Sequence, residues 1–101
     1  MTYDTQTVYT FKLITGEELI CRIIDETNEN FRITKPLTLV PSREGLGMTQ
    51  SMFSATFDKD ARLNKTAIVI GPSETRKDIA ESYIEGTTGI RPVTKPSIIT
   101  G

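Results

Sequence analysis

Residues 30–40, NFRITKPLTLV, carry the apolar–polar alternation that decides the fold of this chain. Every second position from 31 to 39 is apolar, apart from one lysine. The apolar residues on this shared face are Phe31, Ile33, Leu37 and Leu39. Alternation over this length predicts a long strand with one buried face. Pro36 cannot donate a hydrogen bond to a neighbouring strand, so it indicates a bend, a bulge or an edge, and a small curved sheet needs a bend of this kind.

The segments before this stretch predict two more strands joined by a tight turn. Residues 7–14 are rich in β-branched and aromatic side chains, which favour strands. Residues 19–25 are apolar on both faces, which is typical of a strand that is covered on both sides or lies at an interface. Gly16 lies between them and adopts positive φ at no steric cost. We therefore expect the chain to begin with a β-hairpin.

The segments after the central stretch predict a loop and two further strands. Residues 41–50 contain Gly45 and Gly47 and are expected to form the loop. Residues 51–58 and 66–70 are expected to form the fourth and fifth strands, with a charged turn between them. The apolar side chains on these two strands are Phe53, Ala55, Phe57, Ala67, Ile68, Val69 and Ile70.

Residues 74–85 predict one amphipathic helix after the strands. Ser73 suits the N-cap of this helix, and the apolar residues that follow fall on one stripe. The polar residues 1–6 are expected to be flexible, and residues 91–101, which contain two prolines, to be extended or disordered. A single domain over residues 7–90 fits a chain of 101 residues.

The composition argues against catalysis. The chain has no histidine and a single cysteine, Cys21, so no Ser–His, Cys–His or histidine-rich metal arrangement exists. We expect no enzyme activity, no cofactor and no metal. The net charge of −1 gives no basic field that would attract nucleic acid, so RNA would need a local site. No apolar run reaches the length of a membrane span and no leader is visible, so we expect no membrane partner and a cytoplasmic location.

Residues 11–33 resemble the first motif of the Sm-like family. That motif places a glycine in the first turn, as Gly16 does here, followed by an apolar second strand, here residues 19–24. It ends with an acidic residue, which Glu26 or Asp25 matches, and an asparagine before the third strand, which Asn30 matches.

The second Sm-like motif is matched at residues 67–71, an apolar strand followed by Gly71, although Ile70 stands where that motif has a polar residue. The chain is most similar to Sm-like proteins encoded by bacteriophages. Those proteins carry a helix after the last strand, often followed by a phrase like residues 88–90, and a Gly-Leu-Gly-Met stretch like residues 45–48.

The resemblance implies a mostly-β fold, namely a small, strongly bent antiparallel barrel of five strands with a C-terminal helix. It also implies a ring of identical copies, in which the fourth strand of one copy pairs with the fifth of the next and both edges are hidden. A ring of this family binds single-stranded RNA, which here would contact Asn28, Asn30 and Gly71.

Two functions stay open at this point. The resemblance favours RNA binding on a ring face, because asparagine amides recognise bases by paired hydrogen bonds. A protein-interaction or assembly ring without a nucleic-acid role is favoured by the acidic balance, by Glu26 and Glu29 near Asn30, and by the absence of the second motif's arginine. Asn28 and Asn30 also suit a simple turn between two strands.

Overall fold

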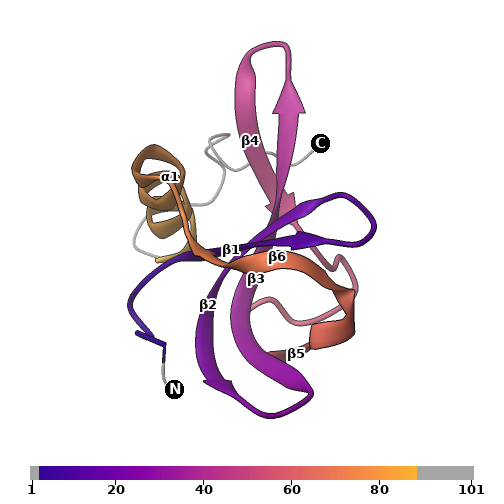
Figure 1. Ribbon diagram of the computed structural model, residues 1–101. Helices are drawn as coiled ribbons and strands as arrows, with labels where there is room; N and C mark the ends of the chain where they lie inside the picture. The colour runs from indigo at the N-terminus through magenta and orange to yellow at the C-terminus, as the bar shows by residue number, and fades with distance from the viewer. Residues whose placement is uncertain (1–2, 89–101) are drawn as a thin grey trace.

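A strongly curved antiparallel sheet and one helix make up the computed structural model, which describes residues 3–88 (Figure 1). The strands in this range are β1 (Tyr9–Leu13), β2 (Glu18–Glu26), β3 (Asn30–Ser42), β4 (Gly45–Gln50), β5 (Ala61–Asn64) and β6 (Ile68–Glu74). A 3-10 turn, η1 (Lys65–Ala67), joins β5 to β6, and the helix α1 is Lys77–Thr87. The mostly-β class with a C-terminal helix is therefore confirmed.

The long strand β3 organises the sheet because it pairs with three others. The strand order is β4-β3-β2-β1-β6, and β5 pairs with β3 at its opposite end from β4. Residues 30–33 of β3 pair with β5, and residues 37–42 pair with β4. Between these two pairings stand Lys35, which has a φ of 51°, and the buried Pro36. The bend expected at the proline is therefore found there.

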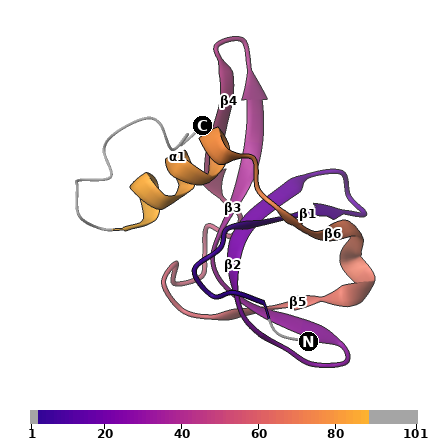
Figure 2. The same cartoon turned by 60° about the vertical axis from the view of Figure 1, so that its left-hand side comes forward.

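The sheet has two open margins. On one margin β6 pairs with β1 only, and on the other β4 and β5 each pair with β3 only, so the sheet does not close within residues 3–88. Figures 1 and 2 show β5 and β6 following one another through the short η1 turn. Each of these strands keeps one side of its backbone available for pairing.

Three predictions between residues 41 and 64 are wrong. The expected loop at 41–50 contains β4, and the expected strand at 51–58 has no strand structure. The charged turn that was expected next contains β5, so the sheet has six strands in place of five. The reason is competition for one edge of β3: β4 and β5 already occupy it at either end. The chain between them loops out past the bend, where Pro36 offers no hydrogen-bond donor.

The last strand and the helix both begin later than expected. Residues 65–67 form η1, and β6 runs from residue 68 to residue 74. Ser73 and Glu74 pair with Thr10 and Tyr9 of β1, so they extend the strand and do not cap the helix. Arg76 is the N-cap of α1 and makes no capping hydrogen bond with its side chain.

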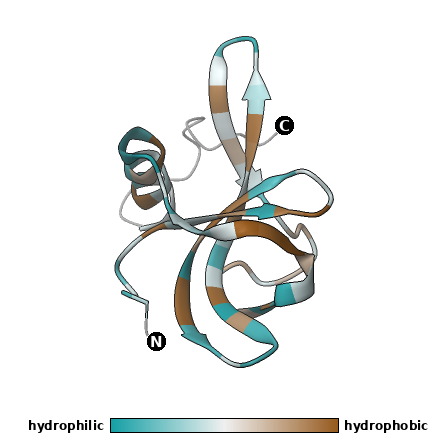
Figure 3. Cartoon of the chain, viewed as in Figure 1, coloured by the Kyte–Doolittle hydropathy of each residue, from teal (hydrophilic) through white to brown (hydrophobic). Residues whose placement is uncertain are grey.

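The core consists of two clusters, one on each face of the sheet. The buried residues of the first cluster are Tyr9, Phe11, Leu19, Cys21, Ile23, Phe31 and Ile33. Those of the second, which packs under α1, are Val8, Ile20, Leu37, Met48 and Tyr83. β2 supplies both clusters, which confirms the interpretation of its two apolar faces. Figure 3 shows the corresponding brown bands along the strands.

The N-terminal residues that the structure describes pack on the first cluster. The ring of Tyr3 lies edge-on to Tyr9 and Phe31, with centroid distances of 5.6 and 5.8 Å. The backbone N–H of Asp4 donates to the Tyr9 hydroxyl at 3.3 Å. Residues 3–6 therefore form a turn against the core and not the flexible arm that we expected. The tail expected at 91–101 lies outside the described residues.

Cys21 is expected to resist thiol reagents in the folded protein. Its side chain has no exposed surface, and burial raises the pKa of the thiol far above its usual range. Because the thiolate is the reactive species, native protein at mildly alkaline pH should be alkylated by iodoacetamide orders of magnitude more slowly than protein in guanidinium chloride. Intact-mass spectrometry measures the labelled fraction. Equal labelling rates in both conditions would contradict the burial of this side chain.

Candidate functional site

Two short connections that are far apart in the sequence meet at one end of the sheet. These are the turn at residues 27–29, between β2 and β3, and η1, between β5 and β6. The backbone N–H of Lys65 donates to the carbonyl oxygen of Glu29 at 2.9 Å. The Lys65 Nζ lies 2.5 Å from an oxygen of Glu26 and 5.0 Å from the centroid of the Phe31 ring. These contacts hold the two connections together, and we call the surface they form the loop site.

Asn30 lies at the base of the loop site, where β3 begins. Its backbone is fixed by Thr27, whose N–H donates to the Asn30 carbonyl at 2.8 Å and whose hydroxyl accepts from the Asn30 N–H at 3.0 Å. The side-chain amide of Asn30 has no hydrogen-bond partner among residues 3–88, and the residue is half-buried. The turn interpretation therefore explains the backbone of Asn30, and its amide remains available to a ligand.

Asn64 and Lys65 also belong to the loop site, and the sequence alone did not place either of them there. Asn64 stands opposite Asn30 in the pairing of β3 with β5. Its side-chain oxygen accepts from both the N–H and the hydroxyl of Thr66, each at 2.9 Å, which caps η1. An asparagine two residues before a threonine is a local signal for such a cap. The proximity of Asn64 to Asn30 could not be inferred, because it depends on the pairing of β3 with β5.

Of the other two residues expected to bind RNA, Asn28 lies on the turn of the loop site and Gly71 lies on β6. Asn28 is exposed on the turn, and no hydrogen bond joins its side chain to the described part of the chain. Gly71 lies on β6 with a φ of 130°. A Cβ at this position would lie 2.9 Å from the Thr10 carbonyl oxygen and 3.1 Å from the Phe11 Cα. Packing against β1 therefore explains the glycine at position 71.

The charges around the loop site largely neutralise one another. Arg32 bridges two carboxylates, with 2.7 Å from Nη2 to Asp25 and 2.5 Å from Nη1 to Asp60. The hydrogen bond from Arg32 lowers the pKa of the Asp25 carboxyl, so this group stays ionised at neutral pH. Lys65 is matched by Glu26 in the same way. The surface is therefore one of mixed charge and not a basic field.

The residues expected at the oligomer interface separate into three groups. Phe53 and Ala55 lie exposed on the irregular segment, and Phe57 packs on the second cluster. Ala67 and Ile68 are partly buried in η1 and at the start of β6. Val69 and Ile70 are 60% and 59% exposed on β6, the strand at one margin of the sheet, and Figure 3 shows a brown segment there. Of the two strands expected to pair between copies, only the second is a strand.

No group of histidine, cysteine, aspartate or glutamate side chains suited to a metal ion occurs within residues 3–88. The single helix of this region is too short and too polar to cross a membrane. Comparison of the chain with protein-family models and with curated proteins found no match.

Proposed function

We propose that the chain is a non-catalytic, Sm-like binding module that assembles into a ring of identical copies and binds single-stranded RNA at the loop site. The observation that carries this proposal is the meeting of the two connections at Lys65 and Glu29, together with the unpartnered Asn30 amide on β3 opposite Asn64 of β5. The strong bend of the sheet at Pro36 and its open margins support the Sm-like barrel as its architecture.

The two open margins support self-assembly. β5 and β6 each lack a partner on one side within the described residues, and β6 exposes Val69 and Ile70 there. Pairing of β5 in one copy with β6 in the next would satisfy both backbones and cover the apolar side chains. Because the two margins differ, the contact is head-to-tail, and a head-to-tail contact closes into a ring when the rotation per copy allows it.

Light scattering on the purified protein tests the assembly. The mass is expected to be several times the 11.2 kDa of one chain, and it should not change on dilution through the micromolar range. A Val69→Asp substitution places a charge on the open margin of β6 and should lower the mass to that of the monomer. Val40→Asp adds a charge to β3 and serves as the matched control, with an unchanged mass expected. A wild-type monomer at micromolar concentration would overturn the ring.

Asn30→Ala is expected to weaken RNA binding about tenfold or more. An amide that pairs with a base edge contributes roughly 1–3 kcal/mol, by analogy with bidentate base contacts in DNA. Fluorescence anisotropy with labelled U-rich and A-rich oligonucleotides at low salt measures the affinity. Gln50→Ala removes an exposed amide from the end of β4, outside the loop site, and should bind like wild type. If Asn30→Ala binds as tightly as Gln50→Ala, with unchanged circular dichroism and mass, the loop site is not where RNA binds.

The acidic surroundings of the loop site favour the second function, a ring that assembles or holds proteins without binding RNA. Asp25, Glu26 and Glu29 all lie on or beside the turn, where they repel phosphates. This function predicts no anisotropy change with either oligonucleotide at low salt, while light scattering still gives the mass of a ring.

A further inference from the structure

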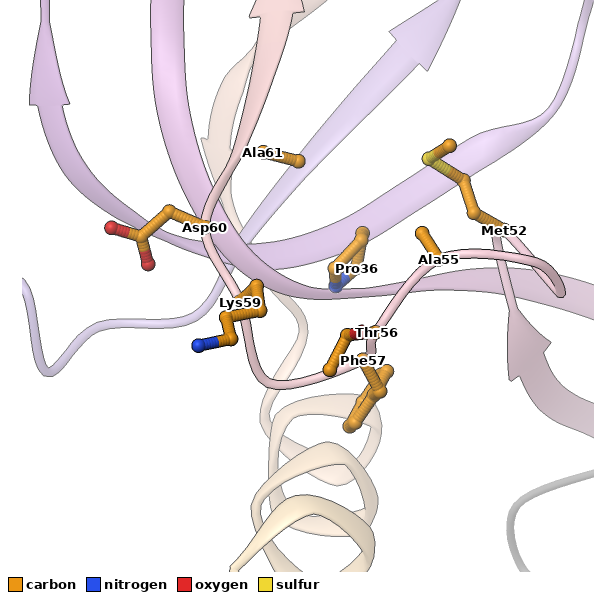
Figure 4. Close-up of a pocket in the computed structure, with 8 residues that line it drawn as sticks. All are labelled: Pro36, Met52, Ala55, Thr56, Phe57, Lys59, Asp60 and Ala61. Atoms are coloured by element: carbon orange, nitrogen blue, oxygen red, sulfur yellow. The ribbon is translucent and has the colours of Figure 1, made fainter.

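A cavity of about 190 Å³ opens beneath the irregular segment that replaces the expected fourth strand (Figure 4). Pro36 of β3 and Ala61 of β5 line one side of it, and Met52, Ala55 and Phe57 from the segment line the other. These five side chains are apolar, and the polar groups of Thr56, Lys59 and Asp60 complete the lining. The volume exceeds that of an engineered cavity of about 150 Å³ that binds benzene, so a branched aliphatic side chain fits.

The segment that forms this cavity is anchored at both ends. At its start, the Ser51 N–H donates to the Pro36 carbonyl at 3.3 Å, and the Ser51 hydroxyl hydrogen-bonds that of Thr38 at 2.9 Å. Towards its end, Phe57 packs on the second core cluster. The cavity is therefore a fixed feature of the fold, built from a stretch of chain that pairs with no strand.

We propose that this cavity receives Val69 or Ile70, the two apolar side chains on the β6 margin of a second copy of the chain. The inference rests on the ring assembly proposed above and identifies what each copy supplies to its neighbour. The cavity begins at Ala61, the first residue of β5, so a strand that pairs along the open side of β5 passes its mouth. β6 is such a strand, and its Val69 and Ile70 have most of their surface exposed in a single copy.

Neither Val69 nor Ile70 lines the cavity of its own copy, so within one chain the two side chains stay exposed and do not fill the cavity. Each copy gives an apolar margin to one neighbour and accepts one from the other. Edge pairing alone would let any antiparallel strand add to β5, whereas an occupied cavity fixes which residues stand opposite each other. The irregular segment then fixes the register in which β6 of one copy pairs with β5 of the next.

Two kinds of variant test this assignment. Ala55→Phe fills the cavity from an exposed position, and Met52→Glu introduces a charge into it. The double variant Val69→Ser, Ile70→Ser removes the apolar side chains from the margin. Each variant alone should behave as a monomer by light scattering. Ser54→Phe adds the same ring to the same segment without lining the cavity, and it should keep the mass of wild type.

A mixture of a cavity variant with the margin variant tests the assignment most directly. Ala55→Phe keeps an intact β6 margin and the double variant keeps an intact cavity, so an equimolar mixture can form one good contact but cannot close a ring. The mixture should have about twice the mass of one chain. The assignment is overturned if both cavity variants keep the wild-type mass, or if folded variants stay monomeric when mixed. A monomeric wild type would instead overturn the ring itself, together with this assignment.

Discussion

Gly71→Ala is expected to lower the free energy of unfolding by about 3 kcal/mol or more. Two costs combine at this position. A φ of 130° is a conformation that side chains with a Cβ rarely adopt, and it costs on the order of 1–3 kcal/mol. The added Cβ would also lie 2.9 Å from the Thr10 carbonyl oxygen, so β6 must move away from β1. Urea unfolding followed by circular dichroism measures the loss.

Gly45→Ala provides the matched control, because Gly45 has a similar φ of 118° but nothing within 4 Å of its added Cβ. This variant should lose only the conformational cost, roughly 1–2 kcal/mol. Equal losses in the two variants would mean that the contact between β6 and β1 is looser than the structure describes.

Tyr83→Ala should destabilise the protein by about 3–5 kcal/mol, the usual loss when a large buried aromatic is truncated. Tyr83 is fully buried and is the main anchor of α1 on the second cluster. Its hydroxyl donates to the Lys35 carbonyl at 2.7 Å and lies 3.2 Å from that of Thr34. The same urea titration reports the change in the free energy of unfolding.

Tyr83→Phe distinguishes the contribution of the buried ring to stability from that of the hydroxyl. It keeps the packing and removes only the hydrogen bonds, so a loss of about 1 kcal/mol is expected. A loss as large as that of Tyr83→Ala would contradict this division, because the hydrogen bonds to β3 would then outweigh the burial of the ring.

The parts of the fold that the sequence predicted well are those encoded locally. The alternation in residues 30–40 and the two apolar faces of residues 19–25 depend only on neighbouring positions, and both segments are strands at close to the expected bounds. The turn at Gly16 is of the same kind, with a φ of 105°. Each of these signals is local in the sequence and does not depend on a distant partner.

Residues 41–64 could not be predicted in this way, because several segments compete there for one edge of β3. Phe53, Ala55 and Phe57 alternate like a strand, yet the edge beside them is taken by β4 and β5. Gly47 was interpreted as a breaker but is buried opposite Val40 in β4. Deciding between these segments requires knowing which pairings form, and that is a property of the whole sheet.

The same distinction between local signals and signals that depend on strand pairing applies to the residues of the candidate site. Asn30 was identified through the resemblance of residues 11–33 to the first Sm-like motif, which is local in the sequence. The proximity of Asn64 to Asn30 could not be predicted, because it depends on the pairing of β5 with β3 across more than thirty residues of chain. Gly71 was expected to contact RNA because it matches the second Sm-like motif. In the structure, close contact with β1 explains a glycine at this position.

The interruption of β3 at Lys35 and Pro36 affects how the domain unfolds locally. The ladder with β4 and the ladder with β5 lie on opposite sides of this point, and β2 pairs with β3 on both sides of it. The helix bridges the gap, because Tyr83 binds the carbonyls there and the Lys35 ammonium donates to the Thr87 carbonyl at 3.1 Å. Undocking α1 would therefore leave β2 to join the two parts, and we expect the amide hydrogens of the β3–β4 hairpin beyond Thr38, where β3 has no partner on β2, to exchange before those of the curved half.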